Sequence, residues 1–237
     1  MQPSSSQLPP VIHLIFQVGD VILGRYEIVG RLGEGVFSVV FKANDLQNGG
    51  EVAVKQGKPG ELADLVDLEK EFEMHKSLDP YEFSPSLIEY NEAPDHGPFM
   101  VMSVEGRSLS QRHREQDLSE ATILLYLFHA LTAINKLHKL GFCHCDVNIG
   151  NIAESKTNGK DRIILLDYQC AQDYCPDLAQ QDIEQLFTGF QLIAWSHKRF
   201  GKIHQIWSNK KDTDIETLIA AIEDSHEFDK DASFDWK

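Results

Sequence analysis

The chain is short of basic residues. Its 237 residues include 22 lysines and arginines against 37 aspartates and glutamates, which gives a formal net charge of −15. An acidic protein gains no counterion release on binding a nucleic-acid backbone, and anionic lipid surfaces repel it. The composition therefore argues against nucleic acid and membrane surfaces as binding partners.

Long apolar runs and a framework of cysteines are missing as well. The apolar stretches, such as residues 123–127, are far shorter than the roughly 20 residues that a membrane-spanning helix needs. The opening MQPSSSQLPP has neither the basic segment nor the apolar core of a secretory signal. With only four cysteines, no disulfide scaffold is expected, and we predict a cytoplasmic location, with the nucleus as an open alternative.

What is present is a globular composition, with 42% hydrophobic and 25% charged residues. Runs of β-branched and aromatic residues bounded by turn residues predict strands at residues 26–32, 38–43, 51–56, 87–90, 98–103, 151–154 and 162–166. Apolar residues at helical spacing predict helices at residues 61–78, 178–196 and two more, capped at Asp117 and Thr213. This order of elements indicates an α+β fold.

Two fragments in the first half suit a phosphate-binding site. LGEGVFSVV, residues 32–40, is a glycine-rich turn between two predicted strands, and Gly33 and Gly35 would let backbone N–H groups approach phosphate oxygens. Downstream, VAVK ends at Lys55, whose ammonium group could emerge beside the sheet under that turn. Taken singly, an ordinary hairpin turn and a solvated edge lysine explain these fragments at least as well.

Two fragments in the second half carry acidic and amide side chains. CHCDVNIGNI, residues 143–152, fits the pattern H-x-D-x-x-x-x-N, with Asp146 placed to accept a hydroxyl proton and Asn151 to offer an amide oxygen to a metal. ILLDYQ places Asp167 after an apolar strand, which suits a Mg²⁺ ligand that bridges phosphates. Each fragment has an ordinary structural explanation, but all four in this order leave little room for it.

Together the fragments resemble the eukaryotic protein-kinase superfamily over about residues 18–193. The resemblance implies a bilobal protein-kinase-like fold, with an antiparallel sheet and one helix in the N-lobe and a truncated, mainly helical C-lobe. Residues 1–17 would then be a disordered leader, 18–105 the N-lobe and hinge, 106–225 the shortened C-lobe, and 226–237 an acidic tail.

The resemblance also implies ATP and Mg²⁺ as cofactors. Lys55 would contact the α- and β-phosphates, Asp146 would be the catalytic base, and Asn151 and Asp167 would hold Mg²⁺. The resemblance further implies a catalytic glutamate, paired with Lys55, on the helix that follows the strand.

Helical periodicity selects Glu71 as that glutamate. It lies three residues after Leu68 and four before His75, on the predicted buried face, whereas Glu69 and Glu73 point elsewhere at about 100° per residue.

The adenine site is also assigned by resemblance. Met102 would be the gatekeeper and residues 103–105 the hinge, and MVMSVEGRSL is similar to the hinge of casein-kinase-1-like enzymes. The expected ATP-binding residues are Leu32, Gly33, Glu34, Gly35, Val36, Phe37, Ser38, Val40, Ala53, Lys55, Met102 and Glu105.

The catalytic loop departs from the family pattern at three positions. Cys145 replaces the arginine that usually reads activation-loop phosphorylation, so that switch is expected to be absent. Asn148 stands where Ser/Thr kinases usually carry a lysine, and Gly150 is not the arginine typical of tyrosine kinases. In addition, the D-F-G triplet reads Asp167-Tyr168-Gln169, and loss of its glycine restricts φ.

The C-lobe is short. Asp182 lies only 15 positions after Asp167, and 55 residues follow it. Asp182 with Leu186 resembles the start of the helix after the activation segment. There is no A-P-E triplet and little room for a peptide-docking loop. This layout is similar to RIO-type, Bud-type and aminoglycoside-phosphotransferase-like kinases.

The favoured function is ATP- and Mg²⁺-dependent phosphoryl transfer to protein Ser/Thr hydroxyls. A small-molecule or atypical kinase and an ATP-binding pseudokinase stay open as alternatives. The expected partners are ATP and a protein substrate or small-molecule acceptor. The cysteines at 143, 145, 170 and 175 could gather near His144 as a redox or zinc site, although ordinary core and surface thiols explain them better.

Overall fold

A computed structural model describes residues 14–58, 68–78, 81–93, 95–156, 163–209, 214–225, 228–232 and 234. The chain divides into two compact units. The first comprises residues 1–73 and 87–104, and the second comprises residues 74–86 and 105–237. Residues 1–13 of the predicted leader, 61–67 of the predicted helix and 226, 227, 233 and 235–237 of the predicted tail lie outside the described residues, as does Thr213.

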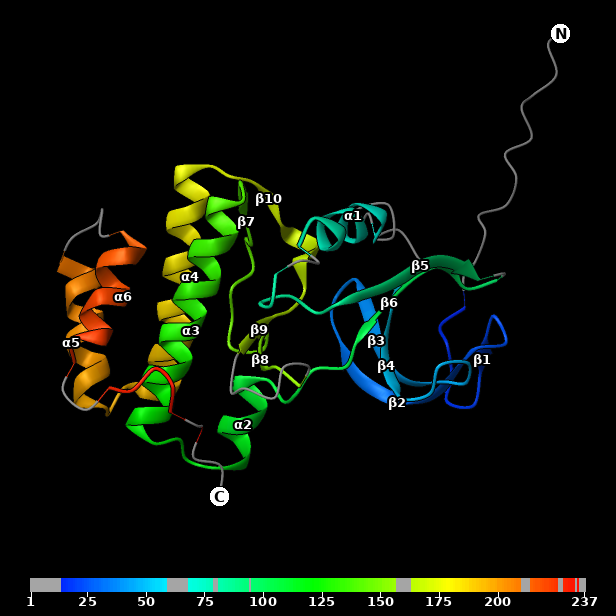
Figure 1. Ribbon diagram of the computed structural model, residues 1–237, viewed down its shortest axis with the longest axis horizontal. Coiled ribbons are helices and arrows are strands. Elements are labelled where there is room, and N and C mark those ends of the chain that lie inside the picture. The colour runs from blue at the N-terminus through cyan, green and yellow to red at the C-terminus, as the bar shows by residue number, and fades with distance from the viewer. Residues whose placement is uncertain are drawn as a thin grey trace, which may run out of the picture. The chain divides into compact units, whose positions relative to one another are not determined.

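The first unit is built on a six-stranded antiparallel sheet with strand order β1-β2-β3-β4-β6-β5 (Figure 1). The strands are β1 (Val21–Ile22), β2 (Tyr26–Glu34), β3 (Ser38–Asp45), β4 (Glu51–Gly57), β5 (Leu87–Ala93) and β6 (Gly97–Ser103). Five of these strands were predicted, each within a few residues of its observed ends, whereas the two-residue β1 was not.

Tight turns fix the register of the sheet. The β3–β4 connection contains Gly49 and Gly50 with φ of +76° and +88°, a region in which a side chain would be strained. In the sheet, Lys55 is paired with Val40 on β3 and with Met100 on β6. This places the lysine on a central strand, and its side chain is only 3% exposed.

Helix α1 (Leu68–Leu78) follows β4. Leu68, Glu71, His75 and Leu78 are buried, whereas Glu69 and Glu73 are exposed. The buried positions recur every three or four residues, so one stripe of the helix faces the interior, as the sequence pattern predicted. The first six residues of α1 belong to the first unit and the remaining five to the second.

The second unit is organised around α3 (Glu120–Lys139) and α4 (Pro176–Ala194). Figure 1 shows these two helices side by side, with α5 (Lys198–Asn209) and α6 (Ile215–Glu223) packed beside them. Twelve of the 20 residues of α3 are buried, which makes it the central helix of this unit.

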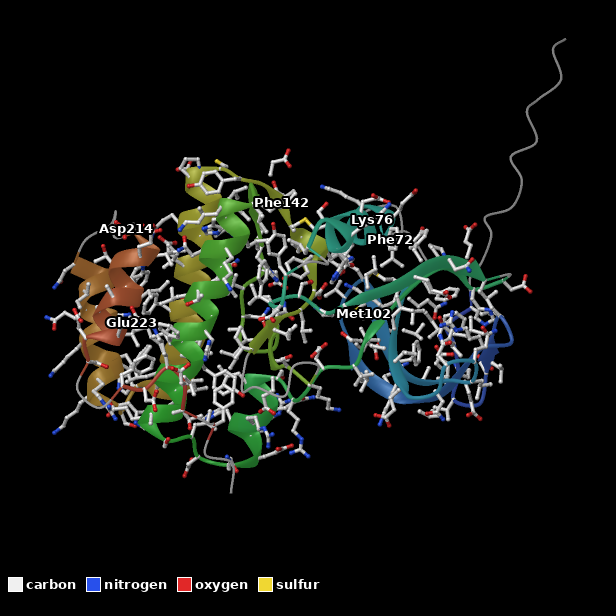
Figure 2. The ribbon with its side chains drawn as sticks, in the orientation of Figure 1. Phe72, Lys76, Met102, Phe142, Asp214 and Glu223 are labelled. Carbon is white, nitrogen blue, oxygen red and sulfur yellow. The ribbon has the colours of Figure 1, made fainter. Side chains whose placement is uncertain are left out.

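Helix starts depend on short polar caps. Helix α3 begins after Ser119, whose hydroxyl accepts the backbone N–H of Thr122, rather than at the predicted Asp117. Helix α6 begins after Asp214, whose carboxylate accepts the N–H of Thr217 at 2.6 Å. Figure 2 shows Asp214 and Glu223 at opposite ends of α6.

Two helices of the second unit were not predicted, α2 (Leu109–Glu115) and α5. The short strands β8 (Ile152–Glu154) and β9 (Ile163–Leu165) pair with each other, as do β7 (Phe142–Cys143) and β10 (Gln172–Asp173). The segment between β7 and β8 is the H-x-D-x-x-x-x-N loop. Among the described residues, no helix combines the length and the apolar character needed to cross a membrane.

Candidate active site

The first unit contributes a buried ion pair. Lys55 on β4 donates from Nζ to both carboxylate oxygens of Glu71 on α1, at 2.7 Å each. The side chains are 3% and 1% exposed. A buried bidentate contact fixes the position of the ammonium group on the sheet. The sequence pattern had selected this glutamate over Glu69 and Glu73.

The glycine-rich turn is a tight hairpin between β2 and β3. The Gly35 N–H donates to the Ser38 carbonyl at 2.9 Å, and Val36 and Phe37 form the tip. A Cβ added at Gly33 would meet nothing within 4 Å, and one at Gly35 would meet only the Ser38 carbonyl at 3.9 Å. The space beside both glycines is therefore open, although the Gly35 N–H already donates within the hairpin.

Charged side chains flank this turn. Glu34 forms ion pairs with Arg31 and with Lys58, the latter at 2.6 Å. The hydrogen bond from Lys58, followed by the charge of Arg31, lowers the pKa of Glu34 below its usual value. Glu34 therefore stays anionic, and its carboxylate contacts Lys58 and Arg31.

An apolar cluster lies on the same sheet. Ala53 on β4 pairs in register with Met102 on β6, and both are buried with Met100 and Leu68. Val40 and Phe72 pack against this cluster, and Figure 2 labels Met102 and Phe72. Leu32 is 41% exposed on β2. The predicted adenine-binding residues of the first unit thus lie on one sheet, while Glu105 belongs to the second unit.

The second unit carries the predicted catalytic base. Asp146 is half-buried. Asn151 donates from Nδ2 to Oδ2 of Asp146 at 2.9 Å and to the backbone carbonyl of Asp146 at 3.0 Å. Because both bonds use the amide nitrogen, the amide oxygen of Asn151 is the atom that is left to face a cation. Asn148 donates to Oδ1 of Asp146 at 3.2 Å.

A neutral histidine, His144, forms hydrogen bonds that hold this loop in place. His144 is fully buried; its Nε2 lies 3.0 Å from the Leu166 carbonyl, and its Nδ1 accepts the N–H of Asp146 at 3.3 Å. These contacts select the tautomer with the proton on Nε2. Burial lowers the pKa of His144 below 6.5, since the charged form would be desolvated.

Asp182 on α4 holds the backbone of the site in place. From the sequence it was identified only as resembling the start of the helix after the activation segment. Its carboxylate is 0% exposed and accepts the backbone N–H groups of His144 at 2.8 Å and Cys145 at 2.7 Å. Oδ2 also lies 2.8 Å from Nε2 of His138. The signal in the sequence was an acidic residue within an apolar helix.

Asp167, the predicted second metal ligand, follows β9. It has φ +63° and ψ +76°, and Cys145 also has φ +63°. Left-handed backbone at a residue other than glycine costs on the order of 1–3 kcal/mol and clusters at functional sites. Four non-glycine residues of the described part of the chain have positive φ, and two of them are a predicted metal ligand and the immediate neighbour of the predicted base.

Tyr168 was identified from the sequence only as part of the Asp167-Tyr168-Gln169 triplet, and its aromatic neighbours were not predicted. The ring of Tyr168 is buried between those of His75 and His144, with centroids 5.1 and 5.0 Å away. Burial raises the pKa of the Tyr168 phenol well above 10, so it is neutral. The stack supports the segment that carries Asp167.

Two groups of side chains could hold a cation. Asn151 and Asp167 offer the oxygen ligands that Mg²⁺ prefers. Separately, one ligand atom each from His138, Cys143 and Asp182 lie within 4.8 Å of one another. In that second group both carboxylate oxygens already accept hydrogen bonds, and burial raises the pKa of the Cys143 thiol, which opposes the thiolate that a metal requires.

Comparison with known proteins identifies the family. The model of the protein kinase domain family matches residues 26–209. The chain belongs to the protein kinase domain family. Its fold is therefore that of a kinase domain, with the sheet of the first unit as the N-lobe and the helices of the second as the C-lobe.

Individual relatives are distant. A probable serine/threonine-protein kinase of Dictyostelium discoideum is 26% identical over 204 residues, which are 81% of this chain and 41% of the relative. Cyclin-dependent kinase 20 of Rattus norvegicus is 27% identical over 170 residues, 70% of this chain and 48% of the relative. The chain thus spans less than half the length of these two relatives.

A solved structure agrees on the fold. The crystal structure of a kinase domain superposes with a TM-score of 0.62 at 18% identity, and the match covers 77% of this chain and 67% of the other. At this identity the likeness supports the kinase fold alone.

Proposed function

We propose that this chain is an ATP- and Mg²⁺-dependent protein kinase that transfers a phosphoryl group to Ser or Thr hydroxyls. Membership in the protein kinase domain family and the probable serine/threonine-protein kinase among the relatives support the reaction class. The observation that carries the proposal is the ion pair of Lys55 with Glu71, at 2.7 Å to both oxygens and almost fully buried.

A buried lysine–glutamate pair is a poor means of stabilising a fold. Desolvation of the two charges offsets most of their attraction, and apolar side chains of similar volume often stabilise a protein as well or better. The pair is better explained by function. Glu71 holds the ammonium of Lys55 at one place on the sheet, where it can neutralise phosphate charge without reorganising during the reaction.

Residues of the second unit supply the remaining chemistry. When bound, Mg²⁺ neutralises charge on the transferred phosphoryl group. Asn151 and Asp167 are the residues that would hold it, through the amide oxygen of Asn151 and the carboxylate of Asp167. Asp146, oriented by Asn148 and Asn151, would accept the proton of the attacking hydroxyl, a contribution of about 10²- to 10⁴-fold in rate.

Phosphate transfer from γ-labelled ATP tests the proposal. Wild type, Lys55→Met and Asp146→Asn are incubated with Mg²⁺ and a generic protein acceptor. We expect labelled serine or threonine with wild type and a loss of at least about 100-fold with either variant. Wild-type labelling no greater than that of Asp146→Asn would refute the proposal. A nucleotide-induced thermal shift without turnover would instead identify a pseudokinase.

A small-molecule kinase is the second candidate because the segment after Asp167 is short. The turn Tyr168–Cys170, strand β10 and the start of α4 at Pro176 follow one another directly, so this stretch, all of which the structure describes, contains no extended loop to hold a peptide. A phosphorylation screen over hydroxyl-bearing metabolites distinguishes the two candidates. Transfer to metabolites but to no protein would favour the second.

The proposed setting is a reducing compartment such as the cytoplasm. None of the four cysteines, all of which the structure describes, forms a disulfide, and the composition is strongly acidic. The proposed partners are therefore ATP and the phosphate acceptor rather than nucleic acid or a lipid surface.

A further inference from the structure

Asn148 makes three hydrogen bonds within the catalytic loop. Its Nδ2 donates to the backbone carbonyl and to Oδ1 of Asp146, at 3.2 Å each. Its Oδ1 accepts the N–H of Gly150 at 2.9 Å. The bond to the residue two positions ahead is the local turn that asparagine side chains favour. The amide oxygen of Asn148 is thereby held by Gly150, and the amide nitrogen is directed at Asp146.

The carboxylate of Asp146 receives one amide donor on each oxygen. Asn148 donates to Oδ1 and Asn151 donates to Oδ2, at 3.2 and 2.9 Å. Two donors on separate oxygens fix the plane of a carboxylate, whereas one would leave it free to rotate about the remaining bond. Each oxygen keeps a lone pair for a substrate hydroxyl.

Gly150 leaves the space that Asn148 occupies. A Cβ at position 150 would lie 2.9 Å from Oδ1 of Asn148, closer than such atoms approach. The φ of Gly150 is not in the left-handed region, so backbone freedom does not explain this glycine. Any larger residue would push the end of the Asn148 side chain away from its turn.

We propose that Asn148 is the positioning residue of this kinase for Asp146, and that Gly150 is small because Asn148 must fit beside it. The inference rests on the proposed function. Asn148 orients the carboxylate by donating a neutral hydrogen bond, at the position where Ser/Thr kinases usually carry a lysine. Small displacements of a reacting group can cost about 10²-fold in rate, so loss of this contact lowers turnover.

Substitutions at position 148 separate the donor from the turn. Asn148→Asp is isosteric and keeps an acceptor for the Gly150 N–H, but it cannot donate to Asp146. Asn148→Lys lacks that acceptor but restores a donor. We expect kcat to fall roughly tenfold to 100-fold in Asn148→Asp and Asn148→Ala, with KM for ATP within about twofold. Asn148→Lys should recover most of kcat.

A double-mutant cycle tests the role of Gly150. Gly150→Ala should fold normally and lower kcat as Asn148→Ala does, because its methyl group displaces Asn148. In the Asn148→Ala background the same change should have no further effect, since nothing is left to displace. Asn209→Ala, at an exposed position at the end of α5, is the matched control and should leave kcat unchanged.

The outcomes are distinct. Wild-type kcat in Asn148→Asp, or additive losses in the cycle, would overturn the inference while the proposed function stands. If wild type transfers no phosphate, the proposed function fails by itself. The contact is then tested by the side-chain amide NMR signals of Asn148, identified by their absence in Asn148→Asp. They should shift in Asp146→Ala, and unchanged signals would also refute the contact.

Discussion

Oδ1 of Asp182 accepts the backbone N–H of Cys145 at 2.7 Å, so a carboxylate on α4 holds the residue immediately before Asp146. Cys145 is also in a left-handed conformation, with φ +63°. A strained residue persists only where its surroundings hold it in place. The shape of the catalytic loop therefore depends on a helix that begins 30 residues further along the chain.

Asp182→Ala should strongly destabilise the protein. The change leaves the buried N–H of His144 and the part-buried N–H of Cys145 without their acceptor, and each such group costs about 1–3 kcal/mol. We expect the free energy of unfolding, measured by urea denaturation, to fall by about 2–5 kcal/mol. Glu184→Gln, at an exposed position on the same helix, is the control and should change the free energy of unfolding by less than about 0.5 kcal/mol.

The Lys55–Glu71 pair should show strong coupling in a stability cycle. Lys55→Met leaves the buried carboxylate without its lysine and should lower the free energy of unfolding by about 3–5 kcal/mol. The double variant Lys55→Met/Glu71→Leu should be markedly more stable than either single variant, because an apolar pair replaces two buried charges. Additive losses in the double variant would contradict this account. Phosphate transfer should fall by at least about 100-fold in Lys55→Met, in Glu71→Leu and in the double variant.

Local pattern was enough to predict most of the first unit. Strand and turn residues located five of the six strands of the sheet, and helical spacing selected Glu71 over Glu69 and Glu73. Both signals come from neighbouring residues, because alternation and 3.6-residue periodicity record which face is buried. The fragments of the H-x-D-x-x-x-x-N loop were equally local and carried the family resemblance.

The features that were missed depend on contacts distant in sequence. Asp182 holds a loop nearly 40 residues away, and nothing in its neighbouring residues identifies its partners. Helix α2 is short and buries only Leu109, so it shows no strong apolar stripe. Helix α5 has Gly201 in its interior, which lowers its helical propensity. The starts of α3 and α6 were misplaced by one or two residues because several polar residues compete for the cap.

Cys145, the residue next to the proposed base Asp146, should react slowly as a nucleophile. Burial, with the charge of Asp182, raises the pKa of the Cys145 thiol to about 11, so only about one molecule in 1,000 is a thiolate at pH 8. We expect iodoacetamide at pH 8 to label the exposed Cys170 first, as followed by peptide mass spectrometry. Labelling of Cys145 should accelerate about tenfold per pH unit up to pH 10. Equal labelling rates for the two cysteines at pH 8 would contradict the assignment.

His144 should make the folded state sensitive to mild acid. Its pKa is lowered by burial, so below pH 6.5 the unfolded chain binds a proton that the folded protein does not. The stability that neutral His144 provides is therefore complete above its unfolded pKa and is lost as the pH falls below 6.5, by at most about 1.4 kcal/mol per pH unit. Urea denaturation at pH 7.5, 6.5 and 5.5 measures this slope. His144→Gln should reduce it, whereas His113→Gln, at an exposed position on α2, should leave it unchanged. A slope that is the same in wild type and His144→Gln would show that His144 is not the group that binds the proton.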